Sequence, residues 1–166
     1  MKLSIENSYE YAPQRVFAAR VEPIVRERSC QESGAVSFEV KVDELRDGGA
    51  RVSVTRVLRP TIPDAFKKFT GDTIEVDQVE EWGPAAADGT RRARINVLIK
   101  GQPASMVGTA VLSPSGSGST EEVSGDVTVS IPIIGRMVEP QIVDVVGRAL
   151  RMEQQAAADW IAGWQR

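Results

Sequence analysis

The segment GRMVEPQIVDVVGRALRMEQQAAADWIAGW, residues 135–164, contains the longest helical periodicity in the chain. Its apolar residues recur at spacings of three and four, which places them on one face of an α-helix. They are Ile134, Val138, Ile142, Val145, Ala149, Met152, Ala156 and Trp160. We therefore expect one helix over residues 135–164, about 45 Å long, with Pro140 marking a kink or the first turn. A helix of this length needs a large apolar surface against which its stripe can pack.

The residues before this helix supply such a surface, because their apolar side chains alternate with polar ones at the period of a β-strand. The expected strands span residues 2–9, 35–43, 52–58, 73–82, 91–100, 104–112 and 121–131. Short turns separate most of them, among them residues 47–49 and the Ser/Gly-rich tract 113–120, which we interpret as a hairpin loop. Consecutive strands joined by short turns pair antiparallel. The sequence therefore predicts an antiparallel sheet whose concave face receives the helix.

Two short helices are expected after the first strand, at residues 14–20 and 24–31. Each directly follows a proline, which fits the first turn of a helix. A further helical turn is expected at residues 64–69. The chain of 166 residues has the size of one ordinary domain, so residues 1–166 are assigned to a single domain.

The composition excludes several kinds of site. The chain has no histidine, so neither a Ser-His-Asp or Cys-His catalytic system nor a His-ligated metal site can be assembled. Its one cysteine, Cys30, cannot form an internal disulfide or a cysteine-rich metal site, and it fits a reducing cytoplasm. Cys30 also has no cationic partner that the sequence identifies. We therefore expect no metal, no cofactor and no reactive thiolate.

Net charge and hydropathy limit the classes of partner that the protein is expected to bind. The 23 acidic and 20 basic residues give a net charge of -3, whereas a protein that binds duplex DNA needs a positive face. The basic run at residues 91–94 has no interleaved aromatic residues on which bases could stack. No apolar stretch is long enough to span a membrane, and no signal peptide is visible. We expect a cytoplasmic protein that binds no nucleic acid, does not insert stably into a membrane, and is a monomer or weak homodimer.

The order strand, two short helices, six antiparallel strands and a long helix resembles the helix-grip fold of the START-like (SRPBCC) superfamily. The junction VSIPIIGRMVE, residues 129–139, is similar to that of an actinobacterial branch of this superfamily to which no activity is assigned. The resemblance implies an α+β fold in which a curved, seven-stranded antiparallel sheet wraps around the C-terminal helix. It also implies a cavity between sheet and helix that takes a lipid, sterol, quinone or polyketide.

Polar residues on the apolar face of a strand are the candidates for orienting a ligand, because a buried polar group must find a partner. Asn7 and Tyr9 continue the apolar face of the first strand, Arg56 that of the third, and Gln78 and Glu80 that of the fourth. Arg56 either binds a carboxylate or phosphate head group, or is a solvated charge, or pairs with Glu80. In the first case, replacing Arg56 by alanine should weaken ligand uptake with little loss of stability.

Apolar residues on the inner faces of the sheet and helix are the expected cavity lining or, alternatively, plain core. They are Phe38, Val54, Val97, Val138, Ile142 and Val145. Trp160 and Trp164 are expected to lock the end of the long helix to the sheet.

Three functions are compatible with these features. The first is binding or transport of a hydrophobic small molecule, with apolar burial as the driving force. The second is catalysis of the polyketide cyclase or dehydratase type in the same pocket, where a buried Glu80 with a raised pKa could replace the absent histidine as general base. The third is a co-chaperone-like interaction module, which an exposed apolar patch on the convex face of the sheet would favour.

Overall fold

The computed structural model describes residues 1–59, 67–68 and 70–164. Its elements are β1 (Lys2–Tyr9), α1 (Pro13–Arg20), α2 (Pro23–Glu32), β2 (Ser37–Glu44), β3 (Ala50–Leu58), β4 (Ile74–Trp82), β5 (Arg91–Ile99), β6 (Ala104–Ser115), β7 (Gly118–Val129), α4 (Gly135–Asp159) and the π-helical turn η1 (Trp160–Trp164). The expected strands, the two short helices and the long helix are all found, with closely matching ends. The helical turn expected at residues 64–69 lies largely outside the described residues.

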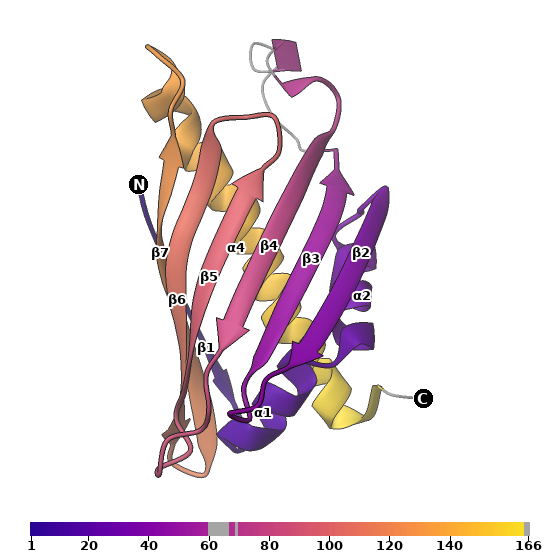
Figure 1. Ribbon diagram of the computed structural model, residues 1–166, viewed down its shortest axis with the longest axis vertical. Coiled ribbons are helices and arrows are strands. Elements are labelled where there is room, and N and C mark those ends of the chain that lie inside the picture. Colours follow the sequence, from indigo (N-terminus) through magenta and orange to yellow (C-terminus); the bar gives the residue numbers. More distant parts are fainter. Residues whose placement is uncertain (60–66, 69, 165–166) are drawn as a thin grey trace.

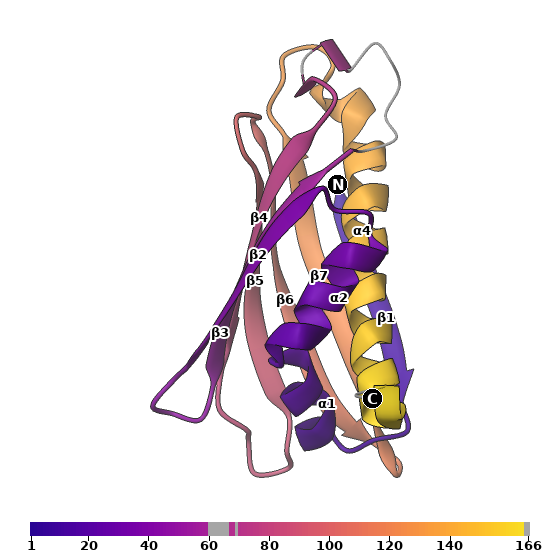
Figure 2. The same ribbon diagram turned by 90° about the vertical axis from the view of Figure 1, so that its right-hand side faces the viewer.

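The strands form one antiparallel sheet in the order β1-β7-β6-β5-β4-β3-β2 (Figure 1). β1 pairs along its length with β7, from Lys2 opposite Asp126 to Tyr9 opposite Ser119. Figure 2 shows the sheet curving around α4, with α1 and α2 beside the C-terminal half of that helix. The predicted α+β architecture, a seven-stranded antiparallel sheet around a long C-terminal helix, is confirmed.

The inner faces of the central strands follow the predicted alternation. Along β3, β4 and β5, every second side chain is buried and those between are exposed or half-buried. Arg56, Gln78 and Glu80 lie on the buried face of their strands together with aliphatic residues. No bulge reverses the register in these strands, and three polar side chains therefore enter the interior.

The Ser/Gly-rich tract forms the expected hairpin, with a shorter turn than residues 113–120. β6 continues to Ser115 and β7 begins at Gly118, so that the strands pair nearly to the turn at Gly116, where φ is 56°. A Cβ atom on Gly118 would lie 2.0 Å from the carbonyl oxygen of Tyr9. Glycine is needed there because the end of β1 approaches the backbone of β7 closely. Small residues thus allow the two strands to pair further toward the turn than expected.

The buried stripe of α4 differs from the expected one in the second half of the helix. Its buried positions are Gly135, Val138, Val146, Gly147, Leu150, Glu153, Gln154, Ala156 and Ala157. Ala149 and Met152, expected in the stripe, are only half-buried there, as Ile142 and Val145 are in the first half. The stripe is rotated because α1 and α2 pack beside this half of α4, and Glu153 faces them.

The end of α4 packs on the short helices rather than on the sheet. Trp160 is half-buried against a small cluster that contains Ala19 of α1 and Val25 of α2. The side chain of Trp164 lies outside the described part of the structure. Among the described residues, no helix combines the length and the apolar character needed to cross a membrane.

Candidate functional site

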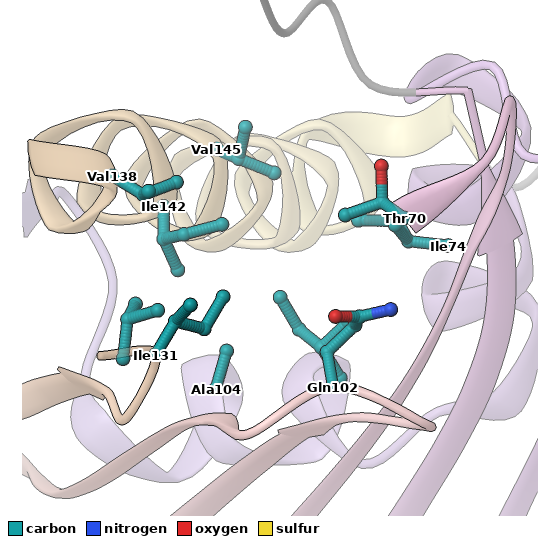
Figure 3. Close-up of a pocket in the computed structure, with 10 residues that line it drawn as sticks. Thr70, Ile74, Gln102, Ala104, Ile131, Val138, Ile142 and Val145 are labelled. Atoms are coloured by element: carbon teal, nitrogen blue, oxygen red, sulfur yellow. The ribbon is translucent and has the colours of Figure 1, made fainter. Parts of the chain in front are cut away.

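An apolar cavity lies between the first half of α4 and the sheet (Figure 3). Its volume is about 40 Å³. The lining residues are Thr70, Ile74, Ile99, Gln102, Ala104, Val129, Ile131, Val138, Ile142 and Val145. In Figure 3 the side chains of Val138 and Ile142 point from the helix toward Ile131 and Ala104 across the cavity. This space is the outer chamber of the candidate site.

An inner chamber of about 20 Å³ adjoins the outer one and shares Ile74, Ile99, Ile142 and Val145 with it. Its other lining residues are Arg56, Leu58, Val76, Gln78, Val97, Val146 and Ala149. Arg56 and Gln78 are the only polar side chains in this set. Each chamber therefore has two polar residues in a mostly aliphatic lining, Thr70 and Gln102 in the outer one and Arg56 and Gln78 in the inner one, and the charged residue is in the inner one.

Beyond the inner chamber lies a network of buried charges. Its members are Arg20 from α1, Arg26 from α2, Arg56 from β3, Glu80 from β4, Glu121 from β7 and Glu153 from α4, and none of them is more than 2% exposed. The three guanidinium groups and three carboxylates balance each other in charge. Six elements of the fold meet at this network.

Glu153 is the centre of the network. Its Oε2 lies 2.7 Å from Nη1 of Arg26 and its Oε1 lies 3.1 Å from Nη2 of Arg56. Nη1 of Arg20 is 3.7 Å from Oε2 of Glu153, and the amide nitrogen of Gln78 donates to the same oxygen at 3.0 Å. One carboxylate of α4 thus holds the helix to α1, α2, β3 and β4.

Glu80 receives hydrogen bonds from Arg26 at 2.5 Å, from the indole nitrogen of Trp82 at 2.8 Å and from Gln78 at 2.8 Å. Burial alone would raise the pKa of the Glu80 carboxyl, but the charges of Arg26 and Arg20 and the hydrogen bonds outweigh burial and lower it to about 2. The expectation of a raised pKa for Glu80 is therefore wrong. Arg20 of α1 and Arg26 of α2 reverse the direction of the pKa shift. The alternation of side chains along the strands cannot reveal these residues, because they lie on helices.

Tyr9 is hydrogen-bonded to the network and does not line the cavity. Its hydroxyl donates to Oε2 of Glu121 at 2.6 Å, and Nε of Arg20 lies 3.2 Å from the other oxygen of that carboxylate. Burial and the charge of Glu121 raise the pKa of the Tyr9 hydroxyl above its usual range. Burial would lower the pKa of Arg20, but Glu121, Glu80 and Glu153 together raise it. Both side chains therefore keep their protons.

The residues singled out from the sequence divide into two groups. Those that line the two chambers are Arg56, Gln78, Val97, Val138, Ile142 and Val145. Those that do not are Asn7, Tyr9, Phe38 and Val54. Asn7 is half-buried on β1, Phe38 is half-buried on the edge strand β2, and Val54 is part of the buried core. They lie on the predicted inner faces of their strands but do not line either chamber.

Arg56 is buried and paired, and its glutamate is Glu153 rather than Glu80. Its Nη2 also donates to the side-chain oxygen of Gln78. This pairing leads us to expect that alanine at position 56 lowers stability, because that change would remove a cation from a buried network.

Sequence reasoning missed Arg20, Arg26, Glu121 and Glu153. Glu121 could have been found by parity, since it shares a face with Val123 and Val127 on β7. Glu153 falls within one turn of apolar residues on both sides, but the rotation of the α4 stripe hides it. Arg20 and Arg26 lie on helices of 8 and 10 residues, too short for periodicity to show which face is inside.

Cys30 is fully buried. Burial raises the pKa of its thiol, although Arg56 and Arg26 are close enough to act in the opposite direction. Cationic neighbours are therefore present, contrary to the expectation, but the thiol stays protonated. In the described part of the chain, no group of three or more Cys, Asp or Glu side chains could hold a metal ion.

The fold is that of START-like helix-grip proteins. A protein of Thermus thermophilus is 18% identical with a TM-score of 0.61, over 95% of this chain and 97% of that one. The STAR-related lipid transfer protein of Xanthomonas axonopodis is 14% identical with a TM-score of 0.59, over 93% of this chain and 84% of that one. Norcoclaurine synthase of Thalictrum flavum is 13% identical with a TM-score of 0.58, over 98% and 87% of the two chains.

Within this class, the chain belongs to the family described as "protein of unknown function (DUF2505)", whose model matches residues 4–161. Uncharacterized proteins of Mycobacterium tuberculosis and Mycobacterium bovis are each 30% identical to it over 128 residues, which is 75% of this chain and 73% of theirs. Since mycobacteria are actinobacteria, these relatives confirm the resemblance to an actinobacterial branch.

Proposed function

We propose that this protein binds a small hydrophobic molecule in the cavity between α4 and the sheet. The observation that carries the proposal is the lining of the two chambers, which is aliphatic apart from Thr70, Gln102, Arg56 and Gln78. Burying an apolar ligand there would gain about 25 cal/mol per Å² of apolar surface removed from water. The shared fold of the Xanthomonas axonopodis protein, named a lipid transfer protein, supports the same proposal.

The ligand requires more room than the two chambers offer. An apolar cavity of about 150 Å³ accommodates benzene, whereas the chambers measure about 40 and 20 Å³. Val138, Ile142 and Val145 in the first half of α4 form one wall, and the ion pairs of Glu153 hold the second half. We infer that entry of a ligand displaces the first half of α4 from the sheet.

The charge network supports binding more than catalysis of the cyclase or dehydratase type. A general acid or base works best when its pKa lies near the working pH. Glu80 has a pKa lowered to about 2, and Tyr9 has a pKa raised above its usual range. Glu80 therefore stays ionised and Tyr9 protonated near neutral pH, and neither side chain lines the chambers.

The outer face of the sheet gives less support to an interaction module. Leu98 and Val107 are 55% and 63% exposed on neighbouring strands. Residues Asn96 and Ser105, which lie opposite them in the strand register, are polar. Isolated exposed apolar side chains of this kind are common on protein surfaces.

The test is a fluorescence titration with N-phenylnaphthylamine, an uncharged apolar probe, on wild type and Ala104→Leu. Leucine at position 104 places three additional carbon atoms in the outer chamber, so we expect binding to weaken at least tenfold. Val107→Leu, on the outer face of the same strand, is the matched control and should bind like wild type. Thermal unfolding verifies that each variant is folded.

Two results would contradict the proposal: wild type that does not bind the probe, or an Ala104→Leu variant that binds it as tightly as wild type. If the proposal holds, mass spectrometry of an organic extract of the purified protein, compared with a mock purification, would then identify the natural ligand.

A further inference from the structure

Arg56 lines the inner chamber, and its guanidinium group has a buried hydrogen-bond donor without an oxygen acceptor. Arg56 donates through Nη2 to Gln78 and Glu153, whereas its Nε is buried and has no oxygen acceptor in the structure. The guanidinium group also interacts with the thiol of Cys30, which is a weak acceptor. The amide nitrogen of Gln78, by contrast, already donates to Glu80 and Glu153. A buried N–H group gains much from an acceptor because leaving it unpaired is unfavourable. Nε of Arg56 is therefore the donor that this chamber can offer to a ligand.

The charges around this donor are already balanced. Arg20, Arg26 and Arg56 offset the three carboxylates, and each guanidinium lies within ion-pair distance of at least one of them. Cys30, which interacts with Arg56, has a pKa raised by burial and adds no charge. An anionic ligand would therefore bring one uncompensated charge into a region closed to water, which is strongly unfavourable.

We propose that the inner chamber binds an uncharged oxygen of the ligand, a hydroxyl or carbonyl group that accepts a hydrogen bond from Nε of Arg56, and that it rejects carboxylates. This inference rests on the proposed function and specifies its ligand class. It differs from the carboxylate or phosphate partner that Arg56 suggests in isolation, because Glu153 already occupies that role. The aliphatic part of the ligand then lies in the outer chamber, between α4 and Ala104.

The first measurement uses wild-type protein with octanol and octanoate, which have equal chain length. Displacement of N-phenylnaphthylamine is recorded at about pH 8, where the carboxylate is ionised. We expect octanol to bind at least tenfold more tightly. Octanoate binding as tightly as octanol would overturn this inference while leaving the proposed function intact. If neither compound displaces the probe and the probe itself does not bind, both proposals fail.

The second measurement changes the charge balance. Glu153→Gln removes one negative charge next to Arg56, so the ratio of octanoate to octanol affinity should rise at least tenfold. Asp144→Asn, which makes the same charge change at an exposed position of α4, should leave the ratio as in wild type. An unchanged ratio in Glu153→Gln would overturn the inference.

The third measurement does not depend on Glu153. Arg56→Met removes the donor but keeps a long apolar side chain. We expect it to lower the ratio of octanol affinity to octane affinity at least tenfold, because octane has no oxygen that could accept a hydrogen bond. Equal losses for octanol and octane would show that Arg56 only shapes the chamber, and the inference would fall.

Discussion

Glu153 connects several elements of the fold through one buried side chain. It is 1% exposed and lies within 3.7 Å of guanidinium nitrogens from three different elements. The desolvation of such a carboxylate is offset only while its partners remain, so a buried pair is weak evidence of net stabilisation but is sensitive to loss of either member. The contribution of Glu153 can therefore be measured by removing it, because the loss of one partner has a larger effect on stability than the intact pair.

We predict that Glu153→Gln lowers the free energy of unfolding by about 3–5 kcal/mol, because Arg26 and Arg56 lose their common partner. Chemical denaturation monitored by circular dichroism measures the change. Asp144→Asn, which removes an exposed ion pair with Arg148, should change it by less than about 1 kcal/mol. A loss in Glu153→Gln no larger than in that control would show that the network is not a structural unit.

The lowered pKa of Glu80 predicts that the stability of the protein depends on pH. Its pKa is lowered from 4.5 to about 2 in the folded protein, so folding favours the ionised form. The stabilisation is fully present above about pH 5 and is lost as the pH falls toward 2, an effect of about 3 kcal/mol from this residue. Urea denaturation at successive pH values measures the decline.

Glu80→Gln should be less stable than wild type at neutral pH and should show a shallower decline on acidification. The matched variant Glu122→Gln, at an exposed position of β7, should keep the slope of wild type. A slope unchanged by Glu80→Gln would mean that other carboxylates are responsible for acid sensitivity.

At the scale of the element, the junction between β7 and α4 sets where the helix begins. Ile133 has a φ of 69° and is 97% exposed, a conformation that is unfavourable for a β-branched residue. Close behind it, a Cβ atom on Gly135 would lie 2.2 Å from the carbonyl oxygen of Val129. This sharp turn brings Val138 over the outer chamber.

We predict that Ile133→Gly raises the free energy of unfolding by about 1 kcal/mol, because glycine adopts a positive φ without steric penalty and the exposed side chain contributes no packing. Ile133→Val keeps the β-branched shape and should be as stable as wild type. Thermal and chemical unfolding provide the comparison. If the glycine variant is no more stable than the valine variant, the turn is not strained in solution.

At the scale of the molecule, the two ends of α4 have different tasks. The first half covers an apolar cavity with no ion pair to the sheet among the described residues, apart from the contact of Glu139 with the N-terminal amino group of Met1. The second half is fixed by the charge network and by the packing of Trp160 on α1 and α2. Local opening is easiest where few interactions oppose it, so we place the proposed entry of the ligand at the cavity end of α4.

We predict that bound N-phenylnaphthylamine slows amide hydrogen exchange in residues 136–146 at least threefold and changes residues 150–158 much less, because the ligand packs under the first half only. Hydrogen-exchange mass spectrometry of free and bound protein measures both segments together. Equal slowing along the whole helix would contradict a division of α4 into two halves.

The alternation of side chains along the chain was enough to predict the fold and some of the residues that line the candidate cavity. Strand parity placed Arg56 and Gln78 on the inner face, and helical spacing identified Val138 and Ile142 as wall residues. These predictions succeed because period and polarity are local properties, and because a curved antiparallel sheet leaves its long helix only one face to cover.

Only the tertiary structure decided which charges meet. Arg20 and Glu153 are 133 positions apart in the sequence, yet they belong to one network. Local periodicity cannot predict a contact between residues this far apart. The direction of the pKa shift of Glu80 depends on guanidinium groups from two helices whose inner faces the sequence leaves open. The uncharged head group that we propose has the same basis. The net charge of a buried site is the sum of the charges that lie near it in space, and the sequence alone does not show which residues these are.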